Sequence, residues 1–202
     1  MIRLDTEVTA APTNDSNDTP KLTVESIDNH IYFYSEVNSD RCLALIKLIK
    51  QIDVNLRNER LSRSIPDSFE KTPIWFHVQS CGGDLMAAFA VADQIKKIHT
   101  PVYSMIEGVC ASAGTILSCC CKKRYITQSS FMLIHQLSSF QWGRYEEFKD
   151  HINLLDMCMK QITNFYKNNT KMNLTKIQAL LKRDSWFDAK QSLALGLVDE
   201  II

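Results

Sequence analysis

The chain has 202 residues, of which 45% are hydrophobic and 23% are charged, as is usual for a globular protein with one sizeable core. Its 23 basic and 23 acidic residues give a formal net charge of zero, so the charge balance favours neither nucleic acid nor an anionic membrane as a partner. No apolar run is long enough to span a membrane, and Arg3, Asp5 and Glu7 stand where a secretory signal would be apolar. We therefore expect a cytoplasmic protein.

The first 22 residues differ in composition from the rest of the chain. They are rich in Thr, Asn, Asp, Ala and Pro and have no apolar periodicity, which predicts a flexible N-terminal arm over residues 1–22. A single domain is expected over residues 23–202. It opens with a strand at 31–34 and a helix from about 39 to 52, and the polar segment 55–72 is expected to be an irregular loop.

The middle of the chain alternates short apolar strands with helices. The pattern predicts strands at 74–79, 102–106, 124–127 and 131–134, with helices at 84–98 and 112–121. Such alternation is typical of an α/β layer fold built from repeated strand–turn–helix units.

A long helix is predicted from about residue 144 to 168, where Gly and Pro are absent. Its apolar residues recur at helical spacing: Phe148, Ile152, Leu155, Met159, Ile162 and Tyr166. Further apolar residues lie off this stripe, which indicates a partner subunit (Leu154, Met157, Cys158 and Phe165). A last helix is expected between Asp188 as N-cap and Gly196 as C-cap, followed by a short terminal strand or extension over 197–202.

The seven cysteines are odd in number and show no metal-ligand spacing. Cys119, Cys120 and Cys121 are consecutive, and on a helix they point in three directions, which suits no common zinc pattern. We expect free thiols in a reducing compartment and no metal site.

The segment from Gly108 to Gly114, G-V-C-A-S-A-G, carries the strongest chemical signal. Small residues around Ser112 suit a sharp turn from a strand into a helix, which places the serine at a helix N-terminus that favours negative charge. His135, at the end of M-L-I-H-Q, could supply a base. Either residue alone is also typical of an ordinary structural position.

A third signal is S-C-G-G-D at Ser80–Asp84, after the strand-like I-W-F-H-V. Two adjacent glycines between a strand and a helix can turn backbone N–H groups outward, toward an anion or an oxyanion. An ordinary strand-to-helix turn has the same residues, so this motif alone leaves both interpretations open.

Together, four ordered motifs resemble those of the ClpP family, the proteolytic subunits of the Clp protease among the ClpP/crotonase-like serine peptidases. The family patterns S-P-G-G, G-x-A-A-S-M-G, M-I-H-Q and R-D-x-F before G-L-[IV]-D correspond to S-C-G-G, G-V-C-A-S-A-G, M-L-I-H-Q and K-R-D-S-W-F before G-L-V-D. The similarity covers residues 27–201. It implies a ClpP/crotonase-like fold of repeated ββα units with a long protruding handle helix at about 144–168.

The resemblance also assigns roles to particular residues. Ser112 matches the nucleophile, His135 the general base and Asp184 the acid that orients the imidazole, while the amides of Gly83 and Ala113 match the oxyanion hole. Without the resemblance, Asp184 could not be chosen among the aspartates.

The activity implied is that of a serine endopeptidase that hydrolyses unfolded proteins and peptides through an acyl-enzyme, without a metal or an organic cofactor. The partners implied are further copies of the chain, in heptameric rings stacked into a tetradecamer by the handle helix, and an AAA+ Clp unfoldase that would use the ATP.

Several departures from the family pattern bear on these expectations. Cys81 replaces a proline, Ala113 replaces a methionine beside the substrate pocket, and Q-L-S-S-F follows the histidine where Q-P-x-G-G is usual. The connection over 55–71 is longer than usual, and the N-terminal arm does not resemble the axial segment that meets the unfoldase.

Three other functions remain open from the sequence. The same peptidase could work without an unfoldase, for instance as a virus-encoded enzyme, or the chain could be a non-catalytic ring subunit. A crotonase-type acyl-CoA enzyme would also use paired amides, but it would not need Ser112, His135 and Asp184 together.

Overall fold

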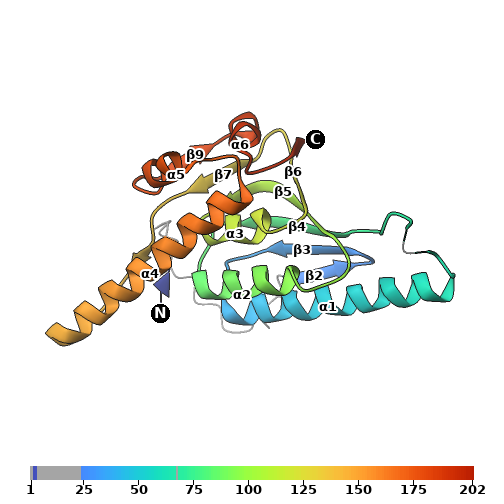
Figure 1. The fold of residues 1–202 in the computed structure, drawn as a ribbon, viewed down its shortest axis with the longest axis horizontal. Helices are drawn as coiled ribbons and strands as arrows, with labels where there is room; N and C mark the ends of the chain where they lie inside the picture. The colour runs from blue at the N-terminus through green and yellow to red at the C-terminus, as the bar shows by residue number, and fades with distance from the viewer. Residues whose placement is uncertain (1, 4–23, 67) are drawn as a thin grey trace, which may run out of the picture.

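The computed structural model describes residues 2–3, 24–66 and 68–202 (Figure 1). Of the predicted N-terminal arm it describes only β1 (Ile2–Arg3), which pairs antiparallel with β8 (Ser138–Ser139). The rest of that prediction lies outside the described residues. In the part of the chain that is described, no helix is both long and apolar enough to cross a membrane.

An eight-stranded sheet forms the centre of the molecule. The order of its main path is β10 (Glu200–Ile201), β6 (Lys123–Ile126), β5 (Val102–Ala111), β4 (Ile74–Ser80), β3 (His30–Tyr34) and β2 (Val24–Ile27). Neighbours on this path are parallel, except for the antiparallel pair β2 and β3. The parallel strands confirm the α/β layer fold predicted from the sequence.

Strand β5 changes partner partway along its length. Residues 103–106 pair with β6, whereas residues 109–111 pair with β7 (Phe131–Ile134). Strand β7 in turn pairs antiparallel with β9 (Ser185–Phe187). The end of β5 is thereby brought beside β7, which places the residues that follow these two strands next to each other.

Helices follow the strands in the predicted alternation. The chain forms α1 (Ser39–Ser62) after β3, α2 (Leu85–Ile95) after β4 and α3 (Ala113–Cys119) after β5. Figure 1 shows α1 and α2 side by side along the sheet. The core between these helices and the sheet is apolar and fully buried, and includes Phe33, Phe76, Leu45, Leu85 and Ile116.

The helix starts have local causes in the sequence. The side chain of Asn38 accepts a hydrogen bond from the Arg41 amide at the start of α1, and Asp84 accepts from the Met86 and Ala87 amides at the start of α2. The last helix, α6 (Ala189–Leu195), begins after Asp188 and ends at Gly196 in a left-handed conformation, as predicted.

The prediction of an irregular loop over 55–72 is wrong in its first half, because α1 continues to Ser62. The residues Asn55–Ser62 include good helix formers, and Glu59 forms an i,i+4 ion pair with Arg63. The Arg60 guanidinium then donates hydrogen bonds to the carbonyls of Pro66, Phe69 and Glu70, which holds the returning segment against the helix.

The sequence patterns do not indicate five of the elements in the described chain. These are the strands β1, β2, β8 and β9 and the helix α5 (Leu174–Leu180). Strand β5 is also longer than predicted, because it continues past Ile106 through Gly108 and runs directly to the residue before Ser112.

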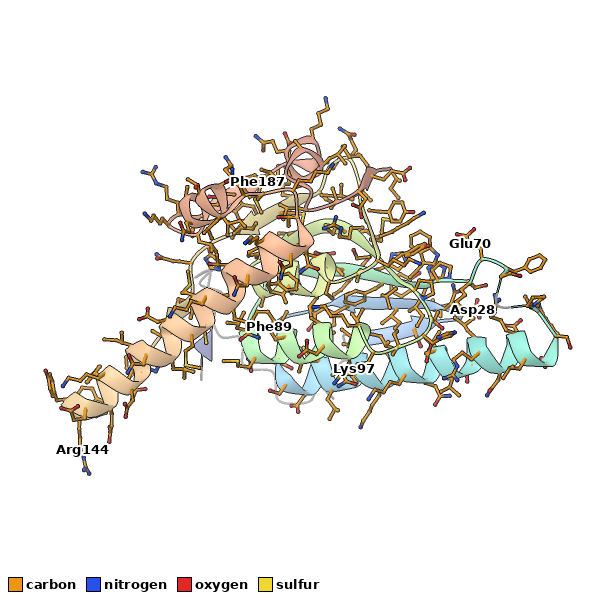
Figure 2. All side chains as sticks on the ribbon, in the orientation of Figure 1. Asp28, Glu70, Phe89, Lys97, Arg144 and Phe187 are labelled. Carbon is orange, nitrogen blue, oxygen red and sulfur yellow. The ribbon has the colours of Figure 1, made fainter. Side chains whose placement is uncertain are left out.

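The predicted long helix is α4 (Tyr145–Asn169), and it protrudes from the body of the molecule (Figure 1). Its buried residues all lie in the C-terminal half: Cys158, Ile162, Phe165 and Tyr166. In the outer half, His151 Nε2 lies 2.9 Å from the hydroxyl of Ser139 in β8. Arg144 lies at the outer end of the helix, far from the sheet (Figure 2). The helix therefore has one anchored half and one half that extends into solvent.

Asp199 of the G-L-V-D motif has a structural partner. It forms an ion pair with Arg124 at 2.7 Å, and the Arg124 guanidinium also donates to the carbonyl of Asn169 at the end of α4. Burial raises the pKa of Asp199, but the hydrogen bonds and charge of Arg124 outweigh it, so the pKa lies below its ordinary value. The arginine joins β6, the C-terminal segment and α4.

On the sheet face opposite the apolar residues of β4, four polar side chains form a hydrogen-bonded cluster. His30 Nδ1 lies 2.9 Å from His77 Nε2, and His77 Nδ1 lies 3.2 Å from Glu107 Oε1. The hydroxyl of Tyr34 donates to the other carboxylate oxygen of Glu107. Burial and the neighbouring His77 lower the pKa of His30, and the nearby Asp28 acts in the opposite direction.

This lowered pKa predicts a loss of stability in mild acid. The unfolded chain binds a proton on His30 more readily than the folded chain. The free energy of unfolding is therefore not reduced by His30 above pH 6.5, where the imidazole is neutral in both states, and it falls as the pH drops from 6.5 toward the lowered pKa. In His30→Phe, which keeps a ring beside Trp75 but cannot titrate, we expect the free energy of unfolding to change less between about pH 7.5 and about pH 5.5. Urea unfolding at both pH values measures this difference. An identical pH dependence in the two proteins would contradict the prediction.

Candidate active site

Ser112 is the single residue between β5 and α3. Its backbone has φ 58° and ψ −127°, a conformation that costs a non-glycine residue about 1–3 kcal/mol and persists only where the surroundings fix it. The Ser112 amide donates to the carbonyl of Leu133 in β7 at 2.9 Å. Its neighbours Ala111 and Ala113 are fully buried, in agreement with the predicted need for small residues at this turn.

The three residues matched to a triad are brought together in the expected order. His135 follows β7, and its Nε2 lies 2.8 Å from the Oγ of Ser112. Its Nδ1 lies 3.4 Å from Oδ1 of Asp184, which precedes β9. The imidazole is buried, whereas the Asp184 side chain is 68% exposed. This arrangement can move a proton from the serine hydroxyl to the imidazole while a carboxylate fixes the ring.

The buried thiol of Cys110 is an unsuitable nucleophile, although it lies in the same motif. Its hydrogen bond goes to the hydroxyl of Ser118, away from His135. Burial raises the pKa of the Cys110 thiol to about 12, so it stays protonated and unreactive near neutral pH. The oxygen of Ser112 is the group that faces the base.

The S-C-G-G-D turn lies against Ser112. Gly82 and Gly83 have φ of 101° and 137°, which side-chain-bearing residues rarely adopt. A Cβ on Gly82 would lie 2.6 Å from the Cβ of Ser112, and one on Gly83 would lie 2.2 Å from the carbonyl oxygen of Val37. Glycine is therefore required at both positions, and Cys81, where the family has proline, is exposed beside them.

Val37 holds this turn and was not identified from the sequence. Its amide donates to the carbonyl of Gly82, and its carbonyl accepts from the amide of Asp84, both at 2.7 Å. These bonds leave the Gly83 amide between them, and within the described chain neither this amide nor that of Ala113 has an acceptor. The Ala113 amide is unused because it belongs to the first turn of α3.

A groove of about 790 Å³ lies between α4 and α5 and begins next to the histidine, at Gln136. Apolar and charged side chains line it, among them Met159, Leu181, Lys160 and Lys182. Its volume falls within the range usual for ligand pockets. The groove is large enough to accept several side chains of an extended peptide.

Comparison with known proteins agrees with this architecture. The chain is 34% identical over 132 residues to the ATP-dependent Clp protease proteolytic subunit 2 of Treponema pallidum, and 34% identical over 134 residues to proteolytic subunit 1 of Protochlamydia amoebophila. Each alignment covers 64% of this chain, and 66% and 65% of the relatives, slightly less than two thirds of their lengths.

A solved structure of a ClpP1 mutant from Listeria monocytogenes has the same fold, with a TM-score of 0.68 and 23% identity over 84% of this chain and 88% of that one. This likeness confirms the predicted ClpP-like fold. The family model described as Clp protease matches residues 28–202, which is most of the chain. The chain therefore belongs to the Clp protease family.

Proposed function

We propose that this protein is a serine endopeptidase of the Clp type, which hydrolyses peptide bonds of unfolded proteins and peptides. The observation that supports the proposal most directly is the 2.8 Å contact between His135 Nε2 and Ser112 Oγ, with Asp184 on the other ring nitrogen. The names of the relatives, proteolytic subunits of ATP-dependent Clp proteases, agree with it.

The proposed reaction follows serine acyl transfer. Ser112 attacks the peptide carbonyl as His135 Nε2 takes its proton, and Asp184 stabilises the imidazolium that forms. The amides of Gly83 and Ala113 donate to the oxyanion, each contributing roughly 3 kcal/mol to lowering the barrier. His135 then protonates the leaving amine, and water hydrolyses the acyl-enzyme with His135 again as base.

Covalent labelling of Ser112 tests this function without knowledge of the cleavage preference. A fluorophosphonate probe should label the wild-type protein and leave Ser112→Ala unlabelled, and peptide turnover should fall on the order of 10⁶-fold in the variant. Native mass and circular dichroism of the variant should match the wild type, because the substitution removes one oxygen. A wild-type protein that assembles but takes no label would instead favour a non-catalytic ring subunit.

The assembly we propose is a homo-oligomer of heptameric rings stacked into a tetradecamer, joined through the outer half of α4. That half exposes apolar side chains: Tyr145, Phe148, Ile152, Leu154 and Met157. Trp142, just before the helix, is 87% exposed. An unpartnered surface of this kind is unusual on a monomer and is suited to burial against another copy.

Replacing Ile152 by Glu should break this assembly. The side chain is 56% exposed in the single chain, and its burial in an interface would contribute up to about 1.5–3 kcal/mol per copy. We expect native mass spectrometry to show smaller particles for Ile152→Glu. Asn153→Glu adds the same charge to an adjacent exposed position without removing apolar surface and should leave the mass unchanged. An unchanged mass in Ile152→Glu would contradict the proposed interface.

An AAA+ Clp unfoldase is the proposed partner that would supply unfolded chains and hydrolyse ATP. The alternative is a peptidase that works alone on already unfolded segments. Degradation of a folded test protein only in the presence of such an unfoldase would separate the two. The proposed location is the cytoplasm, in keeping with seven cysteines that are all unpaired.

A further inference from the structure

One planar peptide group joins Ser112 to Ala113, and it carries the Ser112 carbonyl on one side and the Ala113 N–H on the other. The carbonyl of Ser112 accepts hydrogen bonds from the Thr115 amide at 3.0 Å and from the Thr115 hydroxyl at 2.6 Å. The N–H at the other end is the Ala113 amide, one of the two proposed oxyanion donors. In a trans peptide the C=O and N–H point in opposite directions, so a bond that fixes the carbonyl also aims the amide.

The Thr115 side chain makes a hydrogen bond at the start of α3, where the N-cap residue Ser112 makes none with its own side chain. At the start of a helix, the N-cap side chain commonly binds the backbone of the third helical residue. The Ser112 side chain makes no such bond, because its hydroxyl faces His135. The Thr115 hydroxyl reaches back to the Ser112 carbonyl, so the first turn of α3 is closed while the serine oxygen remains available.

The hydroxyl of Tyr166, on α4, lies 2.6 Å from the Thr115 hydroxyl. The direction of this bond can be deduced. The Ser112 carbonyl can only accept, so Thr115 uses its single proton there, and Tyr166 must be the donor to Thr115. The result is a directed chain from the Tyr166 O–H to the Thr115 O–H to the Ser112 carbonyl.

Tyr166 is suited to act as a permanent donor. It is 3% exposed, and its ring packs edge-on against that of Phe165. Burial raises the pKa of the Tyr166 phenol far above its ordinary value, so the hydroxyl keeps its proton at any physiological pH. Hydrogen bonds in such a chain polarise one another, which strengthens the bond to the carbonyl and the acidity of the amide beyond it.

We propose that Thr115 and Tyr166 are positioning residues for the reaction, which aim and polarise the Ala113 amide of the oxyanion hole through the Ser112 carbonyl. This inference rests on the proposed function of Ser112 as nucleophile. It also means that the packing of α4 on the body of the protein contributes to reactivity at Ser112, since the chain begins on that helix.

Three variants test the chain of hydroxyls. Tyr166→Phe removes the first donor, Thr115→Val removes the link while keeping the shape of the side chain, and Thr115→Ser keeps the hydroxyl. Tyr103→Phe is the matched control, because Tyr103 is also buried but its hydroxyl has no hydrogen-bond partner in the described chain. Each protein is labelled with a fluorophosphonate over a range of concentrations, which separates the maximal rate constant from the half-saturating concentration, and its native mass is recorded.

We expect the maximal labelling rate constant to fall about tenfold in Tyr166→Phe and about a hundredfold in Thr115→Val. The larger of these losses reaches the range that removal of one oxyanion donor causes. The half-saturating concentration should stay within about twofold of the wild-type value, because the chain acts on the reacting atoms rather than on probe binding. Thr115→Ser and Tyr103→Phe should react within about threefold of the wild-type rate. Adding Tyr166→Phe to Thr115→Val should cause no further loss, since the chain is already broken.

The result that would overturn the inference is a labelling rate within about twofold of wild type in both Tyr166→Phe and Thr115→Val. A change confined to the half-saturating concentration, or an equal loss in Tyr103→Phe, would overturn it as well. If Thr115→Val fails to fold, Tyr166→Phe compared with Tyr103→Phe decides the question, and a rate in Tyr166→Phe within about twofold of wild type then overturns the inference. A wild-type protein that takes no label at all would be a failure of the proposed function, which is a distinguishable result.

Discussion

The left-handed backbone of Ser112 is the constraint on which the rest of the site depends. A serine does not adopt this conformation by preference, so the surroundings must impose it. Strand β7 holds its amide, Thr115 holds its carbonyl, and Gly82 comes so close that no side chain fits there. The bond to Leu133 requires the branch of the sheet at which β5 leaves β6 and joins β7. The Thr115 bond is local to the first turn of α3, and Gly82 comes from the turn after β4.

The same branch explains why residues far apart in the sequence converge. His135 follows β7, and Asp184 precedes β9, which pairs with β7, so strand pairing brings the residues of the proposed triad together. The glycine turn after β4 is fixed from the other side by Val37, at the entry to α1. The proposed active site thus lies where the ends of three neighbouring strands meet, a usual place for ligand sites in α/β sheets.

Much of this arrangement could be predicted from the sequence. Apolar runs of strand length indicated the central strands, and small residues around Ser112 indicated the turn. Asp184 has no local signature, because its contact with His135 depends on the pairing of β9 with β7, and only the family motifs indicate it. The C-terminal part of α1 was missed because its helix formers are charged and its apolar periodicity is weak. Helix α5 and strand β9 are too short to leave a clear period.

The supporting contacts could not be predicted at all. Nothing in the pattern around Thr115 or Tyr166 distinguishes them from neighbouring core residues, since their pairing depends on the angle at which α4 crosses α3. Val37 was equally invisible, because its contribution is made by backbone groups. Ser112 and His135 stand out in the sequence because their side chains can take part in acid–base or nucleophilic chemistry. The supporting residues do not stand out, because their contacts depend on distances that the whole fold determines.

Helix α4 connects two distant parts of the molecule. Its buried residues run from Cys158 to Tyr166, so the outer end at Tyr145 lies about 20 Å beyond the first of them, at 1.5 Å per residue. At the packed end, the Tyr166 hydroxyl lies 2.6 Å from the hydroxyl of Thr115, three residues after Ser112. One continuous helix therefore carries an exposed apolar surface at its tip and, at its other end, a contact with the segment that holds the serine.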